Sequence, residues 1–174
     1  INGYWGPLLS WLLIPFLIVG IKPLLSVKLL SLIIGLLTII QSDILIQILK
    51  VDRWVRKFLL PTIVIMVIYF SLSTITPDLL FVSLALVYLN TVLDSSYFYS
   101  KHAGFMCGII GSLLYLAKAY GFAFFLAHYF IINFMFYIRT SNKYRRIIIR
   151  NNYVLGMIIF IFISIFWISA LSNK

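Results

Sequence analysis

Long runs of apolar residues, separated by short polar segments, make up almost the whole chain. Six of these runs approach or exceed the roughly 20 residues that a helix needs to cross a hydrocarbon layer of about 30 Å. They are Pro23–Leu49, Phe58–Leu72, Leu79–Leu93, Ala103–Leu116, Gly121–Tyr137 and Tyr153–Leu171. The runs lack the alternation of a membrane β-barrel, and lipid offers no partner to an open strand edge. We therefore expect an all-α integral membrane protein, a multipass bundle of about six to seven hydrophobic helices.

Composition agrees with this pattern and leaves little room for a soluble domain. Of the 174 residues, 63% are hydrophobic and 10% are charged, and the mean hydropathy is +1.10. We expect residues 1–174 to form a single transmembrane helical domain. The sequence starts at Ile1 with no initiator methionine and no recognisable signal peptide, so we expect it to be an internal part of a longer chain.

The net charge of +10 comes mostly from two short clusters between apolar runs, Lys50–Lys57 and Arg139–Arg150. Short basic loops beside membrane spans mark the cytoplasmic side, and they favour contact with anionic lipid. This distribution predicts membrane lipids as partners and no nucleic acid.

The charge pattern also predicts which polar residues share a side of the membrane. With both basic clusters in the cytoplasm, the segments that hold Asp78 and Lys118 both lie at the outer face. The beginning of the chain is less regular, because the short run Pro7–Gly20 is only about 21 Å long as a helix. Either that run is re-entrant, or Pro23–Leu49 breaks near Gln41–Asp43.

Lys118 and Asp78 are the polar residues with the clearest chemical potential. Lys118 follows an apolar run and stands between Tyr115 and Tyr120. Its ammonium either extends to the membrane interface or binds a lipid phosphate between aromatic walls. Asp78 follows Pro77, a pair suited to the start of a helix, and its carboxylate either stabilises that helix or orients an acceptor.

Aromatic and small residues give two further candidates, each with two interpretations. Tyr4 and Trp5 suit an aromatic belt at the interface as well as the apolar face of a sugar. Gly104, Gly108 and Gly111 follow one another at helical spacing, which indicates either close helix packing or a narrow pocket for a lipid chain.

Metal or cofactor chemistry is not indicated by the sequence. His102 and His128 have no Cys, Asp or Glu at ligand spacing, and Cys107 is the one cysteine. His128 is interpreted as a hydrogen-bonded core residue or, alternatively, as a haem ligand. We expect no metal site and no cofactor.

Three of these segments, taken in order, resemble motifs of the type C membrane glycosyltransferases, the protein-mannosyltransferase-like and aminoarabinose-transferase-like enzymes. Tyr4–Leu13 looks like the proline motif that opens an early helix of that family. Ile75–Leu80 looks like the start of a helix with an Asp, and Gly108–Gly121 resembles a Gly-rich helix that ends in a Leu-Thr-Lys-Gly-like sequence. Ala117 and Ala119 depart from that ending, since the family commonly has Thr and Gly there.

The resemblance implies transfer of a sugar from a polyprenyl-phosphate donor to an acceptor at the outer membrane face. It implies that Lys118 binds the donor phosphate and that Tyr4, Trp5, Asp78 and Tyr120 line the substrate cavity. The family's catalytic Asp belongs to a loop before the proline motif, so we expect the general base to lie upstream of Ile1 and this segment alone to be inactive. The implied location is a bacterial or archaeal plasma membrane.

Two alternatives stay open from the residues alone. One is a non-catalytic multipass subunit with membrane protein partners, because ionisable groups inside the apolar runs are few. The other is a small transporter, for which Gln41–Asp43 is the one polar interruption of a long run.

Overall fold

The computed structural model describes residues 6–73 and 76–172 of the chain. In order, these residues form α1 (Leu8–Ile18), α2 (Pro23–Ile48), α3 (Arg53–Ser73), α4 (Asp78–Leu93), the 3-10 helix η1 (Ser95–Phe98), α5 (Ala103–Ala117), α6 (Tyr120–Arg139) and α7 (Lys143–Ser172). No strand occurs among the described residues. The predicted all-α bundle of about six to seven hydrophobic helices is confirmed, with seven α-helices among the described residues.

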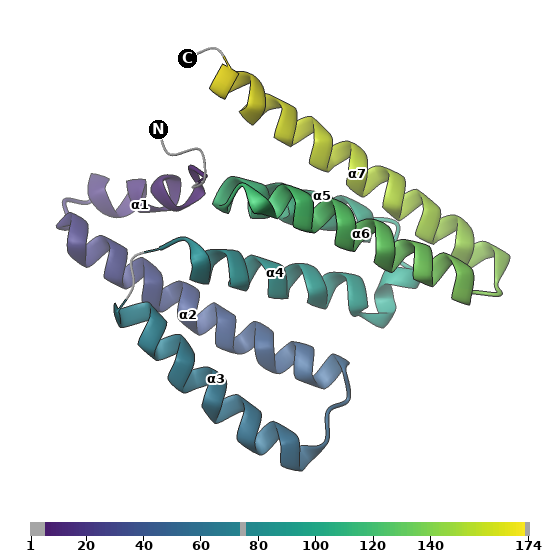
Figure 1. Ribbon diagram of the computed structural model, residues 1–174, viewed down its shortest axis with the longest axis horizontal. Coiled ribbons are helices and arrows are strands. Elements are labelled where there is room, and N and C mark those ends of the chain that lie inside the picture. Colours follow the sequence, from purple (N-terminus) through teal and green to yellow (C-terminus); the bar gives the residue numbers. More distant parts are fainter. Residues whose placement is uncertain (1–5, 74–75, 173–174) are drawn as a thin grey trace.

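The helices lie side by side, and successive helices run in opposite directions (Figure 1). The α2–α3, α4–α5 and α6–α7 connections meet at one end of the bundle, which we call the basic end because it carries both basic clusters. The α1–α2, α3–α4 and α5–α6 connections lie at the opposite end (Figure 1). This arrangement agrees with the topology expected from the charges.

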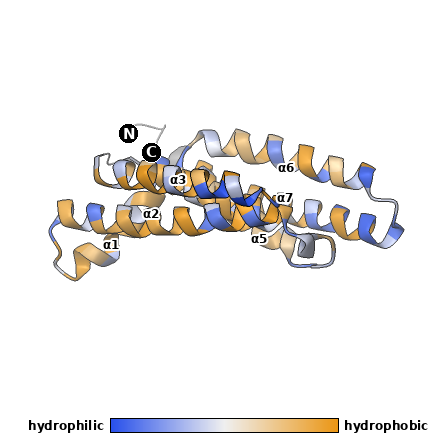
Figure 2. Cartoon of the chain, turned by 90° about the horizontal axis from the view of Figure 1, so that it is seen from below, coloured by the Kyte–Doolittle hydropathy of each residue, from blue (hydrophilic) through white to orange (hydrophobic). Residues whose placement is uncertain are grey.

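Within the described part of the chain, four helices are long and apolar enough to cross a membrane: α2, α3, α6 and α7. Hydrophobic residues follow these helices along most of their length, and hydrophilic residues collect at the α6–α7 turn (Figure 2). Many of the apolar side chains are exposed on the bundle surface, where lipid rather than water is the favourable solvent. The protein is therefore an integral membrane protein with several spans.

Helix α1 does not cross the membrane. Its 11 residues extend about 16 Å, and both of its ends lie at the end opposite the basic one (Figure 1). The chain turns back into α2 at Gly20, whose φ of 84° is left-handed. Helix α2 is continuous through Gln41–Asp43, so the predicted alternative of a break at that point is wrong.

Helix α5 lies at the centre of the bundle, between α4, α6 and α7. Gly104 and Gly108 face Asn152 and Gly156 of α7, and a Cβ at Gly108 would lie 2.5 Å from the carbonyl oxygen of Gly156. Such small residues let two helix backbones approach closely. Gly111 instead faces the Phe125 ring of α6. The glycine row therefore serves packing, because α6 and α7 fill the place where a lipid pocket was the alternative.

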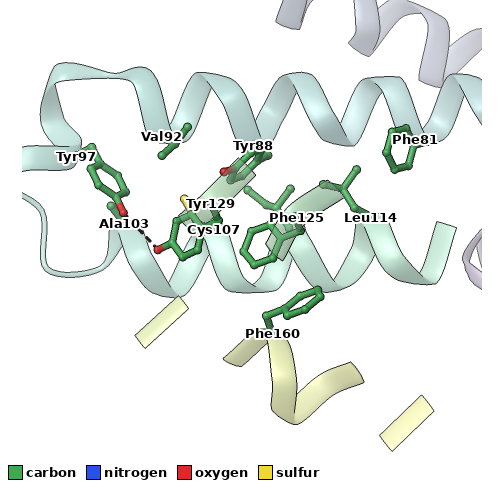
Figure 3. Packing of buried hydrophobic residues seen from close by; sticks show 11 residues of the cluster. Phe81, Tyr88, Val92, Tyr97, Ala103, Cys107, Leu114, Phe125, Tyr129 and Phe160 are labelled. Carbon is green, nitrogen blue, oxygen red and sulfur yellow. Dashed lines mark hydrogen bonds between the residues drawn. The ribbon is translucent and has the colours of Figure 1, made fainter. Parts of the chain in front are cut away.

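A buried hydrogen-bond network ties the irregular η1 segment to the bundle. Asn152 Nδ2 donates to the carbonyl oxygens of Tyr97 (3.1 Å) and Ser100 (2.9 Å). Tyr97 Oη donates to Asn133 Oδ1 (2.6 Å), and Tyr129 Oη donates to the Asn152 carbonyl (2.7 Å); Figure 3 shows the two tyrosines pointing toward each other. Non-helical backbone inside a membrane protein needs such internal partners. The network allows α4 and α5, of 16 and 15 residues, to be shorter than a full span.

Candidate functional site

Lys118 is placed by the tight connection between α5 and α6. It is the residue that follows α5, with an extended backbone (φ −149°, ψ 140°). Its amide still donates to the Leu114 carbonyl (3.0 Å), and its own carbonyl accepts from the Gly121 amide (2.9 Å). Both backbone groups of Lys118 are therefore satisfied, and the side chain is held at the rim of the bundle opposite the basic end.

The Lys118 ammonium forms an ion pair with Asp78, which opens α4 and lies 40 residues earlier in the chain. The prediction that these two residues lie at the same end of the bundle is confirmed. Their side chains differ in exposure, at 6% for Lys118 and 52% for Asp78. The charge that faces the surroundings is thus the carboxylate, while the ammonium lies behind it.

This burial changes the expectation for Lys118. A lysine that merely extends to the interface would expose its ammonium, yet Lys118 is only 4% exposed as a whole residue. An anion that reaches the ammonium from the exposed side of the pair must displace the Asp78 carboxylate or join it.

Tyr120 provides one aromatic wall of the pair. The Lys118 Nζ lies 5.4 Å from the centre of the Tyr120 ring, within the range of a cation–π contact. The Tyr120 ring is itself held edge-on by Phe81 of α4, with 4.6 Å between ring centres. Tyr115, the other predicted neighbour, instead packs against Phe122 with 5.3 Å between ring centres.

Asp78 directs its carboxylate to Lys118 rather than to the amides of its own helix. Pro77 is the N-cap residue of α4, and that helix start has no side-chain capping hydrogen bond. A carboxylate in the first turn still interacts favourably with the positive helix end. Asp78 therefore contributes both to the start of α4 and to the α4–α5 contact.

An apolar groove between α2, α3 and α4 leads to Asp78. It contains about 820 Å³ of empty space, its open side included. Its lining residues are Thr38, Ser42, Ile63, Met66, Val67, Phe70, Thr76, Asp78, Leu79, Val82 and Leu86. The hydroxyls of Thr38 and Ser42 donate to carbonyls of their own helix at 2.8 Å, so they leave the groove effectively apolar. A long hydrocarbon chain is the ligand that such a groove suits.

The aromatic residues predicted to line the cavity, Tyr4 and Trp5, lie outside the described residues. The next residue, Gly6, donates its amide to the Ala117 carbonyl (3.2 Å). A side chain at Gly6 would overlap the carbonyl of Leu116. The start of the chain thus enters the fold directly beside Lys118.

The histidines and the cysteine are not brought together. His128 Nδ1 lies 2.9 Å from the Tyr88 hydroxyl, which agrees with its interpretation as a hydrogen-bonded core residue, and Cys107 is buried. In residues 6–73 and 76–172, no three His, Cys, Asp or Glu side chains are grouped so that they could hold a metal ion.

Sequence patterns alone missed Phe81, which orients Tyr120, and the wall of the groove formed by α3. Which face of an apolar helix meets a neighbour cannot be determined from an apolar run, because almost every position is hydrophobic.

Comparison of the chain with protein-family models, with curated proteins and with solved structures found no match.

Proposed function

We propose that this chain is the membrane part of a glycosyltransferase, which transfers a sugar from a polyprenyl-phosphate donor to an acceptor at the outer membrane face. The proposed membrane is a bacterial or archaeal plasma membrane. One observation carries the proposal: an exposed carboxylate, backed by a buried ammonium, stands where an apolar groove of the bundle ends. This pairing of an apolar channel with charged groups matches a ligand that is a long hydrocarbon with a polar, anionic head.

In this proposal the polyprenyl chain lies in the groove between α2, α3 and α4, and the phosphate reaches Lys118. The ammonium then exchanges part of its contact with Asp78 for a charge-assisted hydrogen bond to a phosphate oxygen. The released Asp78 oxygen accepts a hydrogen bond from a hydroxyl of the sugar or of the acceptor. Tyr120, Tyr4 and Trp5 supply aromatic surface beside the sugar.

The transfer breaks the bond between the sugar anomeric carbon and the phosphate oxygen, and it forms a bond to the acceptor oxygen. The electron pair of the broken bond stays on the polyprenyl phosphate, whose negative charge Lys118 stabilises. The acceptor proton passes to a general base, which the family resemblance assigns to a loop before the proline motif. The groups described here therefore bind and orient the donor.

Binding of polyprenyl phosphate to the full-length protein in nanodiscs tests the proposal, with the matching polyprenol as the ligand that lacks phosphate. We expect the phosphate to bind more tightly than the alcohol, and Lys118→Met to weaken phosphate binding about tenfold or more, since a charge-assisted hydrogen bond contributes about 1.5–3 kcal/mol. Lys101→Met removes the same charge from an exposed loop at the basic end and serves as the control. Equal affinity for phosphate and alcohol would contradict the proposal.

A second candidate is a non-catalytic subunit of a larger membrane assembly. The observation in its favour is that the Lys118 charge is already balanced by Asp78, as in an ion pair that only joins two helices. It predicts that the protein binds neither polyprenyl phosphate nor polyprenol through this groove and that it co-purifies with a defined membrane protein.

A further inference from the structure

A second hollow lies at the basic end, where α6 turns into α7. It contains about 890 Å³ of space, its open side included, and is lined by Tyr137, Ser141, Lys143, Arg146, Ile147 and Arg150. Three cations therefore surround one hollow at the end of two membrane-spanning helices. We call this surface the α6–α7 basic hollow.

An apolar groove of about 440 Å³ continues from the basic hollow along α6 and α7. Its lining residues are Phe130, Asn133, Phe134, Tyr137, Ile149, Arg150 and Tyr153. Tyr137 and Arg150 line both spaces, so the charged hollow and the apolar groove adjoin each other. The groove is open at the side of the bundle, because Phe130 and Phe134 are themselves more than half exposed.

The charge of the hollow is not balanced within this part of the chain. No Asp or Glu occurs after Asp94 in the sequence. Among the described residues, no hydrogen bond or ion pair is formed by the side chains of Arg150 and Lys143, and Arg146 directs its Nε to the Thr140 carbonyl.

The other basic cluster, at the α2–α3 turn, differs in this respect. Its Arg56 pairs with Asp43 at 2.6 Å, whereas the cations of the basic hollow have no carboxylate partner among the described residues. Cation–π contacts occur in both clusters, Lys57 over Trp54 in one and Arg146 over Tyr137 in the other. At the basic end, an external anion therefore finds the most favourable electrostatic interaction in the α6–α7 basic hollow.

We propose that the α6–α7 basic hollow and its groove bind one anionic membrane phospholipid. Arg150 and Lys143 hold the phosphodiester, for which the planar guanidinium of Arg150 offers two parallel donors. One acyl chain lies in the groove between Phe134 and Tyr153. Basic pockets between membrane helices suit anionic headgroups, and an aromatic-lined apolar groove suits the chain. This site is separate from the Lys118–Asp78 pair and does not depend on the proposed function.

Native mass spectrometry of the full-length protein tests the site with two phospholipids of identical acyl chains, phosphatidylglycerol and phosphatidylcholine. We expect one tightly retained phosphatidylglycerol, with about tenfold weaker retention of phosphatidylcholine. Arg150→Gln should lower the affinity for phosphatidylglycerol about fivefold, the effect of losing about one favourable charge at an anionic headgroup. Arg150→Lys keeps the positive charge and should lower the affinity for phosphatidylglycerol less than Arg150→Gln does.

Arg53→Gln is the matched control, because it removes one charge from an exposed position of the other basic cluster and should leave the retention unchanged. If Arg150→Gln and Arg53→Gln lower phosphatidylglycerol retention equally, or if neither lowers it, the lipid binds through general surface charge and the specific site is overturned. Glycerophosphoglycerol, the deacylated lipid with the same single phosphodiester charge and no acyl chains, should not compete at concentrations where phosphatidylglycerol binds. Competition at equal concentration would overturn the role of the groove.

Discussion

The Lys118–Asp78 pair predicts an asymmetry between its two partners that a simple surface ion pair does not have. Asp78→Asn removes the carboxylate and leaves the ammonium of Lys118 in a place where its side chain is only 6% exposed. Lys118→Met removes the ammonium and leaves a carboxylate that is 52% exposed and can be hydrated. We therefore expect the loss of Asp78 to destabilise the protein more than the loss of Lys118.

The size of each effect follows from burial. Leaving a buried charge without its partner costs about 3–5 kcal/mol; since half of Asp78 is exposed, we expect about 2–4 kcal/mol for Asp78→Asn. Lys118→Met keeps most of the side-chain volume and should cost at most about 1 kcal/mol. The double variant should be more stable than Asp78→Asn alone, because the ammonium that lost its ion-pair partner Asp78 is removed as well.

Thermal unfolding in detergent measures these differences. With about 2–4 °C per kcal/mol for a chain of this size, we expect the Tm to fall by about 5–15 °C for Asp78→Asn and by at most about 4 °C for Lys118→Met. Asp43→Asn breaks the pair with Arg56, in which both side chains are partly exposed (31% and 39%), and should change the Tm as little as Lys118→Met. A larger fall for Lys118→Met than for Asp78→Asn would refute this reasoning.

Three further predictions concern the packing and the basic end. Gly108→Val should destabilise the protein by about 2 kcal/mol or more, because its side chain would collide with the Gly156 backbone; an unchanged Tm would contradict this packing. Asn152→Ala should increase hydrogen exchange of η1, whose loop carbonyls Asn152 holds, and unchanged exchange would argue against the network. Hydrogen bonds from Ser96 hold the pKa of Asp94 below its ordinary value of 3.8. The ionised carboxylate therefore stabilises the folded state above pH 3.8, and this stabilisation is lost as the pH falls through the lowered pKa. Asp94→Ala should therefore cost about 0.5–1 kcal/mol at pH 7 and less as the pH falls through the lowered pKa, as chemical unfolding at a series of acidic pH values can show.

The helices and their arrangement were predictable because two simple forces dominate in this chain. Apolar runs must form helices in lipid, and basic loops determine which ends lie together. Those two rules were sufficient to bring Lys118 and Asp78 to one end of the bundle. The same rules did not predict where α1 lies. Its length excludes a full span, and its position depends on the contact of Gly6 with the end of α5.

The details of the site could not be predicted from the sequence. Hydropathy does not distinguish a face that packs on protein from one that meets lipid, so the α2–α3–α4 groove had no signal. Asp78 is exposed and Lys118 is buried, a difference that depends on how α4 and α5 pack and that hydropathy does not encode. The polar network of Tyr97, Asn133 and Asn152 joins three separate segments, and its members are single polar residues in apolar surroundings.

The most direct test of the central claim is photo-crosslinking of polyprenyl phosphate to the full-length protein in membranes. A photoreactive residue replaces Val82, which lines the α2–α3–α4 groove. The control has the same residue at Ile131 of α6, which is exposed on the bundle surface. We predict strong crosslinking from position 82, which unlabelled polyprenyl phosphate abolishes by competition, and weak crosslinking from position 131. Equal, non-competed labelling at both positions would show that the groove holds ordinary lipid, which contradicts the proposed donor site.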